Sequence, residues 1–572
     1  MSAFFVTPAR LLMTAIVAMA VLERPAALTA AANIPNDERA IVHALNRLGF
    51  GGRPGDLDRV RQMGLGAWID QQLRPDRIDT STLDSRLARL STLSREPEDL
   101  AQDFIVVRQE RRQRQLQAGP EGTDAAPSAP GPPMDPAADA MDGRPGSGQR
   151  PPLMSDAAKS TRRVFAELAE AKILRAVYSD RQLEEVLVDF WFNHFNVFAR
   201  KGQTEIYIGE YEREAIRPHI FGSFRELLGA TAKSPAMLVY LDNWMSADPN
   251  AASRMGNLRR PNAGANRPGR ARLGGQRSNA PQTPNPNNAN RMPRGLNENY
   301  ARELLELHTL GVDGGYTQED VVEVARAFTG WTVGRPADPG FRFAAPMHDR
   351  GAKKVLGQTI AAGGGIEDGE RVLDLLAAHP ATARHISFKL AQRFVSDAPP
   401  DDLVDRAANT FTRTKGNLRE VVRTIVTSPE FFAPAAFRAK VKTPFEFVVS
   451  ALRATSADVR QATATVRALA GLGMPLYLCQ PPTGYDETAA TWVSSGALVN
   501  RMNFALAVSA GQMRGVVVNG LSSGGIEDAR QRIVRNALAG DVSSSTLETV
   551  AKAATAEQAV ALVIGSPEFQ RQ

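Results

Sequence analysis

Apolar residues repeat at helical spacing between residues 296 and 329 and predict two helices with marked ends. Asn297 is a good N-cap for the first helix, and Gly311 stands where it ends. One arc of this helix collects apolar residues and a histidine: Ala301, Leu304, Leu305 and His308. The opposite arc collects polar and charged residues: Asn299, Arg302, Glu303 and Glu306. Thr317 and Asp320 form a capping-box pattern that starts the second helix.

A stretch from Leu183 to Val197 predicts a helix of the same kind. Its apolar arc also contains a histidine: Leu183, Val186, Leu187, Phe190, His194 and Val197. Beside that arc lie three polar residues: Asp189, Asn193 and Asn196. Two predicted helices therefore each place a histidine in the middle of an apolar face.

Strand patterns are rare in this chain. Residues 341–344 and 354–360 predict one small hairpin, with residues 348–351 at its tip. Helical patterns dominate elsewhere, so the predicted fold is predominantly α-helical: a compact multi-helix body with one small β-hairpin and two disordered inserts.

The two predicted inserts divide the chain into segments. Both are rich in Pro, Gly and other small or polar residues and have few large apolar ones, so they cannot bury enough surface to offset the entropy of ordering. The predicted segments are an N-terminal helical segment (33–116), the first insert (117–156), a helical core segment (157–249), the second insert (250–295), the core motif with the hairpin (296–366) and a C-terminal helical segment with a degenerate repeat (367–572).

Residues 1–32 have the features of a secretory signal peptide. Arg10 is followed by a short apolar run and then by small residues, and the run is too short to span a bilayer. We expect an exported protein, periplasmic or extracellular, that is not transmembrane after removal of the signal. Cys479 is the single cysteine, so no intramolecular disulfide can form.

The net charge of +6 is concentrated in one segment. Nine arginines and no acidic residue lie between residues 251 and 295, so the rest of the chain is slightly acidic. An arginine-rich insert could bind an anionic envelope polymer or surface by charge. It has no aromatic residue for base stacking, which argues against nucleic acid as a partner.

The two helix-borne histidines have two interpretations. They can be neutral core residues, each hydrogen-bonded to a carbonyl or carboxylate. Alternatively, His194 and His308 converge with His348 or Asp349 from the hairpin tip to bind a divalent transition metal.

The polar arc of the 297–309 helix is the candidate catalytic site. Glu303 and Glu306 with Arg302 could provide one protonated and one ionised carboxyl group, and Asn193 and Asn196 could orient a substrate oxygen or a water. The same spacing is also typical of an ordinary solvated helix face with salt bridges.

Three long motifs carry a resemblance to a known family: NENYARELLELHTLGVDGGYTQEDV, DFWFNHFNVFARKG and MHDRGAKKVLG. With them, the chain from about residue 41 to about residue 569 resembles the bacterial family catalogued as domain of unknown function 1800 (DUF1800). The resemblance implies that the polar string around Glu303 is functional. It also implies a partner, a secreted protein of domain of unknown function 1501, because such proteins are often encoded beside family members.

Two functions of different classes follow. The first is an exported cell-envelope enzyme, hydrolytic or metal-assisted, with its site between the helices at 183–201 and 297–309. The alternative is a non-catalytic periplasmic binding or assembly protein that acts with a secreted partner. An enzyme needs the polar arc in a cleft with perturbed carboxylates, whereas a binding protein leaves it solvated or paired.

Overall fold

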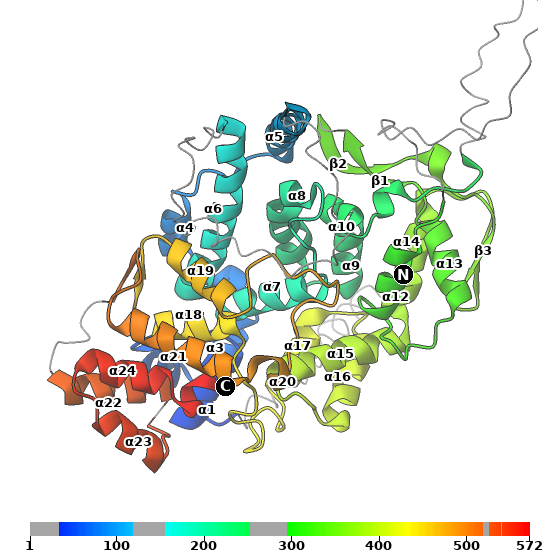
Figure 1. Ribbon diagram of the computed structural model, residues 1–572. Coiled ribbons are helices and arrows are strands. Elements are labelled where there is room, and N and C mark those ends of the chain that lie inside the picture. Colours follow the sequence, from blue (N-terminus) through cyan, green and yellow to red (C-terminus); the bar gives the residue numbers. More distant parts are fainter. Residues whose placement is uncertain (1–33, 118–154, 252–294, 336, 519–524, 539) are drawn as a thin grey trace, which may run out of the picture.

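A computed structural model of the chain describes residues 34–117, 155–251, 295–335, 337–518, 525–538 and 540–572. The described residues form a predominantly helical body, with three small sheets of two strands each (Figure 1). This confirms the predicted fold class. The predicted signal peptide and most of both predicted inserts lie outside the described residues. None of the helices described has the length and apolar character needed to cross a membrane.

Helices of the N-terminal segment pack against the central helices of the body. Asp37 caps the first of them by accepting a hydrogen bond from the Ala40 N–H. The last of them, α5, lies at the top of the molecule in Figure 1, against α6 (Asp156–Tyr178), α8 (Thr204–Glu210) and β2 (Asp338–Phe343). The bounds are α1 (Glu38–Arg47), α2 (Asp56–Met63), α3 (Leu65–Gln72), α4 (Ser81–Leu87) and α5 (Pro97–Gln117).

The central helices are α6 (Asp156–Tyr178), α7 (Gln182–His194), α8 (Thr204–Glu210), α9 (Phe224–Lys233) and α10 (Pro235–Tyr240). α7 is buried along most of its length, as its apolar pattern predicted. It ends at His194, three residues earlier than predicted, because Phe195 leaves the helical conformation with φ −101° and ψ 50°. Asn196 therefore lies on the segment after the helix.

The two helices of the core motif are α12 (Glu298–Glu306) and α13 (Gln318–Ala327). Asn297 caps α12, and Thr317 and Asp320 form the predicted capping box of α13. Hydrogen bonds connect α12 to the segment after α10 across the second insert: the Asn297 amide donates to the Leu241 carbonyl at 2.7 Å, and the Ala247 N–H donates to the Gly295 carbonyl at 3.1 Å.

The predicted hairpin pairing is wrong. Two separate hairpins occupy this region, since β1 (Trp331–Arg335) pairs with β2 (Asp338–Phe343), and β3 (Lys353–Val355) pairs with β4 (Gln358–Ile360). Leu356 and Gly357 both have positive φ, 49° and 77°, and so turn the chain back within two residues. His348 lies between the hairpins and not at a tip. A third pair joins β5 (Asp458–Val459) and β6 (Val516–Val517).

The C-terminal segment adds the remaining helices, and in one of them, α18 (Pro444–Ala454), every residue is buried. α17 (Leu418–Val426) and α24 (Ala556–Ile564) are each followed, after one intervening residue, by Ser-Pro-Glu-Phe. In both copies the serine hydroxyl accepts a hydrogen bond from the phenylalanine N–H. The bounds are α14 (Ile366–Ala378), α15 (Pro380–Phe394), α16 (Asp401–Arg413), α17 (Leu418–Val426), α18 (Pro444–Ala454), α19 (Thr463–Gly471), α20 (Ala489–Trp492), α21 (Ser495–Ser509), α22 (Gly525–Leu538), α23 (Ser544–Ala551), α24 (Ala556–Ile564) and α25 (Pro567–Gln570).

Candidate functional site

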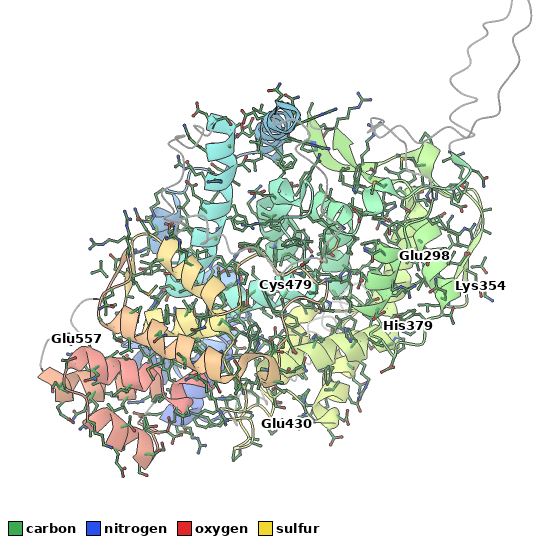
Figure 2. The ribbon with its side chains drawn as sticks, viewed as in Figure 1. Glu298, Lys354, His379, Glu430, Cys479 and Glu557 are labelled. Atoms are coloured by element: carbon green, nitrogen blue, oxygen red, sulfur yellow. The ribbon has the colours of Figure 1, made fainter. Side chains whose placement is uncertain are left out.

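Asn193 and Asn196 hold a loop against the end of α7. Asn193 donates to the Tyr485 carbonyl and accepts from the Tyr485 N–H, both at 2.7 Å. Asn196 donates to the carbonyls of Cys479 and Pro481 at 3.0 and 2.7 Å. Cys479, labelled in Figure 2, is therefore a buried residue of this docked loop. The two amides that we expected to orient a substrate have backbone partners instead.

The docked loop approaches α7 closely at Gly484. Its φ is +73°, and a Cβ atom there would lie 2.3 Å from the Asn193 carbonyl oxygen. A side chain at this position would push the loop away from the helix. Glycine thus permits the reciprocal pairing of Asn193 with Tyr485 one residue later.

His194 and His308 are both buried and lie side by side, with ring centroids 6.3 Å apart. Sequence reasoning missed a third member, His385 on α15, whose ring centroid is 6.1 Å from that of His194. His194 Nε2 lies 3.3 Å from the His308 carbonyl, and His385 Nε2 lies 3.3 Å from the Leu307 carbonyl. We call these three residues the histidine cluster.

The histidine cluster is held in the neutral state. Burial lowers the pKa of His308 to about 3, and the nearby His385 adds to the effect. Burial also lowers the pKa of His385 to about 4 and that of His194 well below its ordinary value. His308 Nε2 is buried and has no hydrogen-bond partner among the described residues. The neutral-core interpretation of His194 and His308 is consistent with this environment.

The structure does not bring His348 and Asp349 to the histidine cluster. His348 contacts the Thr329 carbonyl through Nδ1 at 2.8 Å and the Asp368 carboxylate through Nε2 at 3.1 Å. Asp349 forms an ion pair with Arg326 at 2.8 Å. Across all described residues, no group of three or more His, Cys, Asp or Glu side chains is arranged to hold a metal ion. The predicted metal site, His194 and His308 with His348 or Asp349, is therefore not assembled among these residues.

Glu303 and Glu306 lie half-buried on α12. Burial raises the pKa of Glu303, the charge of Glu306 adds to the rise, and Arg302 opposes it. Glu306 accepts a hydrogen bond from the Tyr316 hydroxyl at 2.9 Å. Arg302 donates to the Gln318 side chain at 2.7 Å, on the side facing α13. The carboxylates form an interacting pair, but the guanidinium and the two asparagines use their hydrogen bonds elsewhere.

A large cavity, here called the cavity beneath α5, is lined by residues of α5, α8 and β1. In Figure 1, α5 lies above α8, with β1 to the side. The volume of the cavity is about 920 Å³. Apolar and aromatic side chains dominate its lining: Ala101, Phe104, Tyr207, Val239, Trp244 and Val333. Volumes of roughly 300–1,000 Å³ with a mostly apolar wall are typical of small-molecule sites.

Few charged groups line this cavity. Lys201 and Asp242 pair with each other at 2.7 Å. Arg108 of α5 is exposed at the wall, as is Trp244, whose exposed fraction is 37%. Glu303, Glu306 and Arg302 do not line it. The main hollow and the predicted polar site are thus different regions of the molecule.

Comparison with protein families decides the relationship suggested by the motifs. The model of the family described as "Protein of unknown function (DUF1800)" matches residues 43–571. The chain belongs to this family. No curated protein and no solved structure matches it. The DUF1800 match includes the histidine cluster, the Glu303–Glu306 pair and the cavity beneath α5.

Two features of this DUF1800 chain were missed from sequence. His385 lies on a helix whose pattern carries no mark of chemistry, and its proximity to α7 depends on packing. The cavity is lined by residues of α5, α8 and β1, and these elements are separated in sequence by the predicted inserts or by long stretches of chain.

Residues 520–524 have the Gly-x-Ser-x-Gly spacing of a hydrolase nucleophile turn, but they lie outside the described residues.

Proposed function

We propose that this DUF1800 protein is an exported binding protein that holds a small molecule by its apolar part in the cavity beneath α5. The observation that carries the proposal is the cavity of about 920 Å³ with its largely apolar and aromatic wall. The features of residues 1–32 support export. Removal of these residues is tested by the mass of protein recovered from the periplasm.

The candidate catalytic residues lend further support to binding over catalysis. An enzyme of the expected kind would gather Glu303, Glu306 and Arg302 in a cleft with Asn193 and Asn196. The asparagines instead bond to the docked loop, and Arg302 bonds to Gln318 at the surface. This arrangement is the one expected of a structural or solvated polar arc.

Cavity filling tests the binding function. A neutral apolar dye, N-phenyl-1-naphthylamine, should bind the protein saturably with a rise in fluorescence. Ala101→Phe should weaken this binding by about tenfold, because the ring occupies some of the cavity and removes about 1.4 kcal/mol of ligand contact. Ala101 has an exposed fraction of only 3%, so the new ring is directed into the hollow or its wall.

The matched control is Ala551→Phe, which adds the same ring at an exposed position of α23. It should leave dye binding unchanged. Both variants are checked for folding by thermal unfolding. Equal dye binding by the original protein and a folded Ala101→Phe variant would contradict the proposed function.

A second candidate function rests on the Glu303–Glu306 pair. Burial and the neighbouring charge raise the pKa of Glu303, and a raised pKa is the direction that a carboxyl group acting as a general acid requires. The Tyr316 hydroxyl donates to Glu306 and thereby fixes the orientation of its carboxylate. A hydrolytic enzyme of the cell envelope is the corresponding proposal.

Glu303→Gln separates the two functions. The raised pKa means that the fold disfavours the ionised side chain, so its contribution opposes folding once the pH rises above the ordinary value of 4.5. At pH 7 the variant should therefore keep or slightly increase its melting temperature. If this stable variant still complements a deletion strain, Glu303 is not a catalytic residue. Glu298→Gln, at the partly exposed start of the same helix (Figure 2), is the control.

A further inference from the structure

We infer that the ligand of the cavity beneath α5 is an amphipathic anion, with an alkyl chain in the apolar hollow and a carboxylate or phosphate group at Arg108. This inference rests on the proposed binding function. It adds the chemical class of the ligand and the residue that selects it.

The charges at the cavity wall point to an anionic group. Lys201 and Asp242 neutralise each other in their ion pair. Glu205 also lines the cavity and interacts with another residue of the protein. Arg108 differs, because it has no ion pair within the portion of the chain that the structure describes. Binding an anion would give this guanidinium a partner that the protein does not supply.

The neighbourhood of Arg108 strengthens this charge. Arg112 follows one helical turn later on α5 and is exposed. Glu110, the acidic residue between them, accepts a hydrogen bond from the Ser155 hydroxyl at 2.7 Å. Arg108 therefore presents its guanidinium at the wall of the hollow, and Arg112 adds a second positive charge one turn further along α5.

Along α5, the apolar contacts to the cavity come first and the cationic contact follows them on the same face. Ala101, Phe104 and Arg108 are spaced by three and four residues, so all three lie on one face of the helix, and all three line the cavity. A ligand lying along this face meets small and aromatic surface first and the guanidinium at its end. Tyr207 and Trp244 supply aromatic surface on the facing walls.

Four ligands with the same sixteen-carbon chain test the inference by displacing the neutral dye below their micelle concentrations: hexadecanoate, hexadecyl phosphate, hexadecanol and hexadecyltrimethylammonium. The two anions should displace the dye at about fivefold lower concentration than hexadecanol, as expected for one partly exposed charge contact. The cation should be the weakest. The concentrations at which hexadecanoate and hexadecyl phosphate displace the dye show whether the site prefers a carboxylate or a phosphate group.

Arg108→Gln should remove the preference for anions and leave hexadecanol displacement unchanged. Arg413→Gln, at an exposed position of α16, is the matched control and should keep the preference. Equal displacement by all four ligands, or an unchanged preference in Arg108→Gln, would overturn the inference while leaving the binding function intact. Failure of every ligand together with unaltered dye binding in Ala101→Phe would instead overturn the binding function itself.

Discussion

Replacing Glu446 by alanine is expected to lower the free energy of unfolding by about 3–5 kcal/mol, the usual cost of removing one member of a buried ion pair. Glu446 on α18 forms an ion pair with Arg393 on α15, and their side chains have exposed fractions of only 2% and 4%. It also accepts hydrogen bonds from the Gln572 side chain at 2.7 Å and from the Thr443 N–H at 2.8 Å. The substitution leaves a buried guanidinium without its closest anion and disrupts the capping box of α18.

The effect of Glu446 should depend on pH. Burial by itself would raise the pKa of this carboxyl group, but Arg393 and the hydrogen bonds from Gln572 and Thr443 outweigh burial and lower it to about 2, from an ordinary value of 4.5. A carboxyl group whose pKa is lower in the folded state than in the unfolded state stabilises the protein at any pH above its unfolded-state pKa. This stabilisation is lost as the pH falls from about 4.5 to about 2. The difference between the original protein and Glu446→Ala should therefore shrink across that window.

Denaturant unfolding at pH 7 and at pH 3 measures both effects. Asp401→Ala is the matched control, because Asp401 also pairs with an arginine, Arg384, but has an exposed fraction of 84%. It should change stability little at either pH. A loss for Glu446→Ala no larger than that of the control would show that the buried pair is not a major source of stability.

Asp368→Ala is the second substitution with a large expected effect, again about 3–5 kcal/mol. The Asp368 carboxylate lies 2.7 Å from Lys353 Nζ, and the Lys353 side chain has no exposed surface. His348 Nε2 contacts the same carboxylate oxygen at 3.1 Å. Lys353 Nζ also donates to the Asp349 and Gly351 carbonyls, but these provide no compensating charge. The variant therefore leaves an ammonium group buried without its closest anion.

A double substitution identifies the cause of this loss. Lys353→Met removes the buried charge and retains most of the side-chain volume, so adding it to Asp368→Ala should recover some of the lost stability. Thermal and denaturant unfolding of the two single variants and the double variant complete the comparison. If the double variant is destabilised by the sum of the two single losses, the two side chains do not interact and the prediction is wrong.

Local patterns predicted much of the helical framework. Asn297, Thr317 and Asp320 act as the caps that their types and spacing indicated. The burial of His194 and His308 followed from their positions on apolar arcs. Such features depend on residues within one or two helical turns, so a single sequence contains the information needed to predict them.

Pairings between distant segments were not predictable in the same way. The hairpin was wrong because residues 341–344 have a nearer partner in β1, and the two-residue turn at Leu356 and Gly357 closes β3 onto β4. Asn193 and Asn196 carried the right chemistry for a site. Their actual partners are backbone groups almost 300 residues away, on a loop with no distinguishing polar pattern.

The sequence by itself determined the helical class, the family and the two histidine-bearing faces, because periodicity, capping and long motifs are properties of neighbouring residues. Tertiary structure alone decided that His385 joins His194 and that His348 pairs with Asp368. It also decided that a hollow of about 920 Å³ remains beneath α5. These features depend on how helices far apart in the chain meet, and side-chain volume and long-range contacts determine that packing without leaving a local pattern.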